Sequence, residues 1–276
     1  MENVERFDTI SAFVNTITER KTHDGWGSLD SNTNGDSGWY GTKSFGEALA
    51  WSVTGYDEGL RKMREQTANI TDMNVVGVGD KPKVRNYHVG GSPNVSRAVM
   101  GLPRDMRQMH VTRGKSKCVD LYMVMQATSD VSVDTMSEVG AKQLAIVSML
   151  ERNGYSVRLS TCSGVCSRNE LGVDEFGWCV TLKGYRDVID YQKLSFAMTN
   201  PAWFRRFGFR YIETYPGYTR SGRMTAYGTR TRHLWDDFGD ELAKSHDNTF
   251  VIDFDELRYH TATDWLRRNG FIGGAR

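Results

Sequence analysis

Residues 118–134 read CVDLYMVMQATSDVSVD, and this stretch decides how the middle of the chain folds. Its first eight residues are mainly apolar, with β-branched and aromatic members, which is typical of a strand buried on both faces. After a polar loop from residue 126, apolar residues recur at helical spacing from Met136 to Leu150, and Gly154 suits the end of that helix. Residues 156–162 have the composition of a second strand. The order strand, helix, strand predicts a parallel pair.

The same alternation continues to the end of the chain. We expect a third strand at 177–185, a helix that Asn200 caps and that runs to about 210, a helix at 233–245, a strand at 249–254 and a closing helix to Gly270. Strands that alternate with helices predict an α/β fold of the layered Rossmann type, with helices on both faces of one sheet.

The beginning of the chain has a different pattern. Residues 24–41 are expected to form a polar loop. After it, Ser44 and Glu47 fit a capping box that opens a short helix, and residues 55–66 predict a second helix. We therefore divide the chain into an N-terminal helical region, 1–73, and an α/β domain, 74–276, that begins with a short strand at 74–80. Residues 81–117 are predicted to be irregular, with a helical turn near 94–100.

Size and composition predict a globular protein. The chain has 276 residues, 39% of them hydrophobic, and no apolar stretch approaches the roughly 20 residues that a membrane-spanning helix needs. Its acidic, amphipathic start is not expected to be a secretory signal. Cys162 and Cys166 form an isolated C-x-x-x-C pair, and Cys118 and Cys179 lie apart from it. Because structural zinc needs four ligands, we expect buried thiols in a reducing cytosol.

Charge is distributed unevenly along the chain. The net charge is +1, yet residues 81–117 hold nine Lys or Arg and only Asp105, and residues 203–232 hold seven Arg and only Glu213. The first 80 residues carry 13 acidic and 7 basic side chains. Two compact basic blocks in an otherwise acidic chain point to a polyanionic partner.

The second block interleaves its arginines with eight aromatic residues. Arginine binds phosphate and stacks on bases, and aromatic rings stack on unpaired bases, so this pattern favours single-stranded nucleic acid. The candidate contacts are basic or tyrosine side chains of the two blocks: Arg205, Arg206, Arg210, Tyr215, Tyr218, Arg220, Arg223, Tyr227, Arg230, Arg232, Lys81, Lys83, Arg85, Arg113, Lys115 and Lys117.

Both blocks also have a structural interpretation. The aromatic residues of 203–211 fall at helical spacing and fit the core, which would leave Arg205, Arg206 and Arg210 on the solvated face of that helix. The following segment, 215–232, has no strong periodicity and is the better binding candidate. The block at 81–117 could instead pair with the acidic ends of the chain.

Catalytic motifs are not found in the sequence. It contains no G-x-S-x-G elbow, Walker A loop, H-E-x-x-H or paired zinc motif, and its histidines are scattered. We predict a protein that is not an enzyme and needs no cofactor.

The loop after the first strand comes close to a divalent-metal motif. Von Willebrand A-type domains place Asp-x-Ser-x-Ser at the carboxyl end of a strand, where the carboxylate and hydroxyls bind Mg²⁺ or Mn²⁺. Here the register that starts at Gln126 lacks the carboxylate, and the one that starts at Asp130 begins about four residues too late. We therefore expect no metal, and we expect Ser132 or Asp134 to cap the next helix.

The chain resembles a poorly characterised family of tailed-bacteriophage proteins with a von Willebrand A-like central layer. The resemblance rests on GTKSFGEALAWSVTGYDEG (41–59), GSPNVSRAVMGLP (91–103), the strand–loop–helix of 124–157, NPAWFRRFGFRYIE (200–213) and the closing helix. It implies a phage protein that works in the host cytoplasm without a metal. More weakly, the chain is similar to accessory proteins of podophages that bind single-stranded DNA and bring the phage's own RNA polymerase to the template.

Together these patterns predict a non-enzymatic protein that binds single-stranded DNA and recruits phage transcription or replication machinery, such as a polymerase. The alternative is a von Willebrand A-like protein-interaction module that serves in phage assembly or beside an ATPase. Neither prediction involves a membrane.

Overall fold

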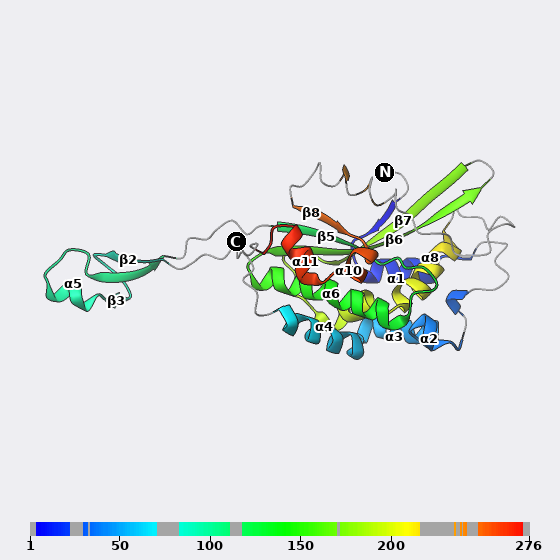
Figure 1. Ribbon diagram of the computed structural model, residues 1–276, viewed down its shortest axis with the longest axis horizontal. Helices are drawn as coiled ribbons and strands as arrows, with labels where there is room; N and C mark the ends of the chain where they lie inside the picture. Colours follow the sequence, from blue (N-terminus) through cyan, green and yellow to red (C-terminus); the bar gives the residue numbers. More distant parts are fainter. Residues whose placement is uncertain are drawn as a thin grey trace.

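A five-stranded sheet in the order β1-β7-β6-β5-β8 forms the centre of the protein (Figure 1). The computed structural model describes residues 4–22, 30–32, 34–70, 83–110, 118–169, 172–215, 235, 238, 240–241 and 248–272. The strands are β1 (Val4–Phe7), β5 (Cys118–Val124), β6 (Ser156–Asn169), β7 (Gly172–Lys183) and β8 (Thr249–Ile252). Only the pairing of β6 with β7 is antiparallel among these neighbours, so the fold is a mostly parallel, Rossmann-like α/β layer.

The predicted strand–helix–strand unit is confirmed. Helix α6 (Val133–Arg152) connects β5 to β6, and these two strands pair in parallel. The Ser132 hydroxyl accepts a hydrogen bond from the backbone N–H of Thr135, which confirms the expected cap at the start of α6. Gly154, with a φ of +86°, ends the helix in the left-handed conformation that glycine tolerates.

One face of the sheet carries the main hydrophobic core. The helices on that face are α1 (Ile10–Glu19), α3 (Phe45–Thr54), α4 (Asp57–Ile70), α6, α7 (Tyr191–Thr199), α8 (Phe209–Thr214), α10 (Phe254–Tyr259) and α11 (Ala262–Arg268) (Figure 1). Along β5, Leu121 and Met123 point to these helices, whereas Tyr122 and Val124 join a smaller cluster with Trp235 on the other face. Both faces of β5 are therefore buried, as its apolar composition predicts.

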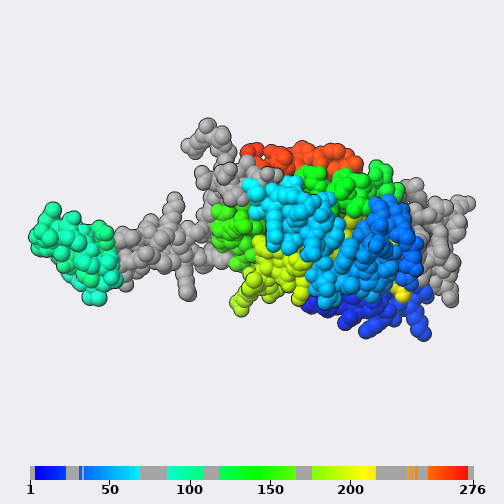
Figure 2. Space-filling model, turned by 90° about the horizontal axis from the view of Figure 1, so that it is seen from below, coloured from blue at the N-terminus to red at the C-terminus, as the bar shows by residue number. Residues whose placement is uncertain are grey.

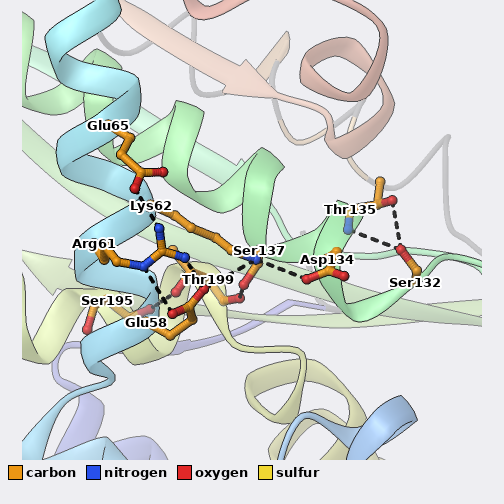
Figure 3. A network of polar contacts seen from close by, with 10 residues as sticks. All are labelled: Glu58, Arg61, Lys62, Glu65, Ser132, Asp134, Thr135, Ser137, Ser195 and Thr199. Atoms are coloured by element: carbon orange, nitrogen blue, oxygen red, sulfur yellow. Dashed lines mark hydrogen bonds and ion pairs between the residues drawn. The ribbon is translucent and has the colours of Figure 1, made fainter.

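Small residues allow α4, α6 and α7 to pack closely. A Cβ atom on Gly140 of α6 would lie 1.7 Å from the Met198 carbonyl oxygen of α7, and a Cβ atom on Gly59 of α4 would lie 1.8 Å from Thr199 Oγ1. Figure 3 shows the polar contacts beside this crossing, where the Ser137 hydroxyl donates to the Thr199 carbonyl at 2.8 Å. Larger side chains at the two glycines would force the helices apart.

The N-terminal residues contribute to the same core and sheet. Strand β1 pairs in parallel with β7, and α4 is joined to the first turn of α6 by the Lys62–Asp134 ion pair at 3.1 Å (Figure 3). The expected helices of this region are α3, which Ser44 caps, and α4. Strand β1 is too short and too polar for its alternation to be recognised in the sequence.

Three further elements differ from the sequence prediction. Helix α7 was not predicted, and the closing helix is divided into α10 and α11 because Thr261 and Asp264 form a capping box that starts a new helix. The helix that Asn200 caps continues beyond 210, through a π-helical stretch (Trp203–Gly208) and α8, to Thr214. The predicted strand at 74–80 and most of the helix at 233–245 lie outside the described residues.

A second, small sheet lies away from the rest of the structure in Figures 1 and 2. Its order is β2-β4-β3, with β2 (Lys83–Tyr87), β3 (Ser92–Pro93) and β4 (Met106–His110) antiparallel, and it carries the short helix α5 (Val95–Val99). We call residues 83–110 the projecting module. The helical turn predicted at 94–100 is confirmed, but the strands were expected to be irregular because they lack an apolar alternation.

Two buried glutamines provide a test of this core. The side chain of Gln143 on α6 is fully buried, and neither atom of its amide has a hydrogen-bond partner within the described structure. Because a buried, unsatisfied amide is costly, we expect Gln143→Met to raise the free energy of unfolding by about 1 kcal/mol. The matched variant is Gln126→Met: the Gln126 amide is also buried but donates to the Gly164 carbonyl, so this change should be destabilising. Urea unfolding of both variants measures the difference, and equal shifts would contradict the assignment.

Candidate nucleic-acid interface

The projecting module is held together by its own backbone and side-chain contacts. The backbone N–H of Asn94, before α5, donates to the Asp105 carbonyl at 2.6 Å, and the Asn94 amide donates to Asn86 Oδ1 at 3.2 Å. The Arg97 guanidinium donates to the Pro103 carbonyl at 2.9 Å. These bonds fix α5 and the turn after it against the strands.

The module is rich in basic residues and exposes apolar side chains. Residues 83–110 include five Lys or Arg and a single acidic residue, Asp105. Five of the eight large hydrophobic side chains that are exposed in the described structure also belong to it, and we call them the apolar tip: Val89, Val95, Val99, Met100 and Leu102. Exposed apolar groups that gather in one place mark an interaction surface.

Arg104 occupies a special position at this tip. Its φ of +61° is the only positive φ of a non-glycine residue in the described structure, and its side chain is exposed. The left-handed region costs an L-residue roughly 1 kcal/mol, so it persists where the surrounding turn imposes it. The turn therefore exposes the Arg104 guanidinium. Met100 and Leu102 of the apolar tip are close to Arg104 in sequence.

Arg205 and Arg206 do not lie where the sequence pattern places them. Both were expected on the solvated face of a helix, but they are 1% and 0% exposed. The expectation is wrong because the π-helical stretch turns two consecutive side chains toward the N-terminal region. In this structure neither guanidinium is accessible to a nucleic acid.

The Arg205 guanidinium holds three segments together. It donates to the Trp39 carbonyl at 2.7 Å and to the Val131 carbonyl at 2.6 Å, and it lies over the Trp39 ring, 4.3 Å from the ring centroid. Burial lowers the pKa of Arg205 to about 10, so the group remains charged at neutral pH. Carbonyl dipoles and an aromatic face therefore compensate the buried cation.

Arg206 and Arg210 are also engaged inside the protein. The Arg206 guanidinium donates to the Thr42 hydroxyl at 2.6 Å and lies over the Tyr40 ring, and burial lowers its pKa. Arg210 Nε donates to the Ile17 carbonyl at 3.1 Å, and the same guanidinium lies 3.9 Å from the buried Glu213. These arginines connect α8 and the π-helical stretch to the first 42 residues.

Most described aromatic residues of this block belong to the core, as the structural interpretation predicted. Trp203, Phe207 and Tyr211 are buried, and Tyr215 stacks on Phe176 with 4.4 Å between ring centroids and an angle of 7° between the planes. The described rings of this block are thus largely occupied within the protein.

The other predicted contacts divide into two groups. Lys83 and Arg85 lie on β2 of the projecting module. The remaining candidates fall outside the described residues: Lys81, Arg113, Lys115, Lys117, Tyr218, Arg220, Arg223, Tyr227, Arg230 and Arg232. The described part of the candidate interface is therefore the module, whose sheet brings the first basic block together with the apolar tip.

The loop after β5 uses its polar groups within the protein. The Gln126 amide donates to the Gly164 carbonyl, and Trp39 Nε1 donates to the Ser129 carbonyl at 3.0 Å. The Ser132 hydroxyl caps α6, and the cation bound to the loop carbonyls is the Arg205 guanidinium. Among the described residues, no cluster of three or more His, Cys, Asp or Glu side chains could hold a metal ion.

Two clusters of interacting side chains lie on the face of the sheet opposite the main hydrophobic core, and neither cluster was predicted from the sequence. Asp120 accepts hydrogen bonds from Arg158 Nε at 2.7 Å and from the Tyr185 hydroxyl at 2.5 Å, and burial together with Asp120 raises the pKa of Tyr185. Cys162 and Cys179 are opposite each other on β6 and β7, with 3.2 Å between their sulfurs, and burial raises the pKa of the Cys162 thiol. The thiols of Cys162 and Cys179 are buried, as expected, whereas Cys118 is exposed.

A small pocket between α3 and α4 was also not predicted from the sequence. It has a volume of about 260 Å³, and its lining includes Trp51, Tyr56, Asp57 and Glu58. The two rings stack with 5.1 Å between their centroids, beside the two carboxylates. A separate cleft of about 470 Å³ lies between α4, α6 and α7, with Leu60 and Met63 among its lining residues.

Comparison with known proteins identifies a family. The model of a family described as a domain of unknown function (DUF7192) matches residues 2–266. The chain belongs to this family. No curated protein matches the chain, and no solved structure does. The family match covers the sheet, its helices and the projecting module, so the module is part of the DUF7192 domain. No helix of the described DUF7192 residues has the length and apolar character that crossing a membrane requires.

Substitution of Arg205 tests its structural role. In Arg205→Met the carbonyls of Trp39 and Val131 lose a charged donor, so we expect the free energy of unfolding to fall by at least about 2 kcal/mol. Arg205→Lys should recover only part of this loss, because an ammonium cannot reproduce the planar guanidinium fork. The control is Arg186→Met at an exposed position, which should change little in urea unfolding. An unchanged Arg205→Met protein would contradict the assignment.

Metal addition tests the loop after β5. If the loop has no metal site, millimolar Mg²⁺ or Mn²⁺ and excess EDTA should leave the melting temperature unchanged, since only a ligand that binds the folded state stabilises it. A metal-dependent increase that Ser132→Ala abolishes would show that the loop does bind a cation.

Proposed function

We propose that the protein is a phage-encoded, non-enzymatic protein that binds single-stranded DNA in the host cytoplasm through its projecting module. The observation that carries this proposal is the projecting module, with five basic residues and one acidic residue, which lies apart from an otherwise acidic chain. A cationic module that stands away from a body of net negative charge can approach a polyanion with little repulsion.

The physical basis is electrostatic attraction with additional apolar contact. Lys and Arg side chains of the module neutralise phosphates and release counterions, which supplies affinity without sequence preference. The apolar tip adds aliphatic surface against which the faces of unpaired bases can be buried. Further basic residues, at 111–117 and 216–232, lie outside the described structure.

Recruitment of phage transcription or replication machinery is the second part of the proposal. The module engages the strand, and the α/β body remains available to a protein such as a polymerase. The alternative is a von Willebrand A-like protein-interaction module for phage assembly, or one that acts beside an ATPase, and the exposed apolar tip is the observation that favours it. A pull-down from infected cells, with and without nuclease treatment, separates the two, since only the DNA proposal predicts that single-stranded DNA is recovered with the protein when nuclease is omitted.

The salt dependence of binding tests the DNA proposal. We expect a labelled oligo-dT strand to bind with an affinity that falls steeply as salt rises. The triple variant Lys83→Ala, Arg85→Ala and Arg107→Ala should bind at least about tenfold more weakly. It should also reduce the slope of log K against log salt by about 2, since each phosphate contact on a single strand contributes about 0.7.

The matched control replaces three exposed cations of the body, Arg186, Lys193 and Arg267, by alanine. This variant should retain the affinity and the salt slope of the unmodified protein. A parallel variant with Arg220, Arg223, Arg230 and Arg232 changed to alanine measures the contribution of the second basic block. The proposal fails if the unmodified protein shows no salt-sensitive binding to single strands, or if the module triple and the body triple behave alike.

A further inference from the structure

The pocket between α3 and α4 has the chemistry of a cation site. Trp51 and Tyr56 present stacked aromatic rings, and the carboxylates of Asp57 and Glu58 lie in the same lining. Aromatic faces attract guanidinium and ammonium groups, and a neighbouring carboxylate strengthens that attraction. Glu58 already binds Arg61 through both oxygens (Figure 3), whereas Asp57 is exposed and accepts one described hydrogen bond, from the Gln192 amide at 2.7 Å. A further cation can therefore bind beside Asp57.

The lining of this pocket also offers an apolar contact. The Trp51 and Tyr56 rings are only partly buried, so they leave apolar surface in the lining. A partner that suits the whole surface combines a guanidinium or ammonium group with exposed aliphatic side chains. It would bury the apolar groups of both surfaces and pair its charge with Asp57.

The projecting module of the same chain has this combination. Arg104 is exposed and held at a positive φ, and Met100 and Leu102 of the apolar tip are close to it in sequence. The charges of the two regions are also complementary. The module has five basic residues and one acidic residue, whereas the described lining of the pocket includes two acidic residues, Asp57 and Glu58, and no Lys or Arg.

We propose that the apolar tip and Arg104 of one copy dock on the α3–α4 pocket of a second copy, with the Arg104 guanidinium beside Trp51, Tyr56 and Asp57. Figure 2 shows the module well separated from the face of its own body on which α3 and α4 lie, so the contact joins two molecules. A tip that binds a pocket is a heterologous, head-to-tail contact, which can repeat from copy to copy. This inference goes beyond the DNA proposal and does not require that proposal to be correct.

Two surface variants test the contact without adding charge. The tip variant combines Met100→Gln and Arg104→Gln, and the pocket variant is Asp57→Asn. After nuclease treatment, sedimentation velocity of the unmodified protein should show association that increases with concentration and passes beyond the dimer. Each variant should need at least about tenfold higher concentration to associate, which corresponds to about 1.4 kcal/mol. The matched control combines Tyr259→Gln on α10 with Glu138→Gln on α6, both exposed, and should associate like the unmodified protein.

Mixing the two variants gives the decisive result. The tip variant keeps an intact pocket and the pocket variant keeps an intact tip, so an equimolar mixture should form one-to-one dimers that do not grow further. Dimer formation in this mixture also shows that both variants are folded, because one must contribute an intact pocket and the other an intact tip. The inference is overturned if the unmodified protein remains monomeric, if the two variants associate as it does, or if their mixture forms no dimer. None of these results bears on single-stranded DNA binding, which the salt-dependence assay measures separately.

Discussion

The buried guanidinium of Arg205 is the contact on which the arrangement of the body depends. It is charged at neutral pH and almost completely inaccessible, so the protein must surround it with acceptors. Those acceptors are backbone carbonyls of Trp39 and Val131, which come from the N-terminal region and from the loop after β5. Three segments that are distant in sequence therefore have to meet at one point. A loop that resembles a metal-binding loop is thus bound by a side chain of the same protein.

Arginines of the two basic blocks serve different purposes in the structure. Arg205 and Arg206 are enclosed and bind backbone groups, whereas Arg104 and Arg107 are exposed on the projecting module. The difference follows from the surroundings. A π-helical stretch in a hydrophobic core turns its arginines inward, but a small module without a large core leaves Arg104 and Arg107 in water. A high count of arginines next to aromatic residues does not distinguish these cases.

Much of the central layer could be predicted because local signals and tertiary packing agree there. The apolar run of β5, the cap at Ser132 and the glycine at position 154 each act within a few residues, and each appears where expected. Strand β1, the antiparallel pairing of β7 and helix α7 depend on partners elsewhere in the chain, so their sequences carry little local signal. The same holds for the candidate surfaces. The α3–α4 pocket combines Trp51 and Tyr56 with Gln192 of α7, and no motif spans that separation.

The sequence by itself determined the α/β class, the strand–loop–helix at 118–152 and the presence of two basic blocks, because periodicity, capping and charge are properties of short segments. Only the tertiary structure decided which basic residues face water. It buried Arg205 and Arg206, whose donors are satisfied by carbonyls distant in sequence, and it exposed Arg104, Arg107 and the aliphatic side chains of the apolar tip. The physical reason is that the burial of a side chain depends on which surfaces meet in space. A pattern along the chain specifies the surface of each segment but not the surface that it packs against.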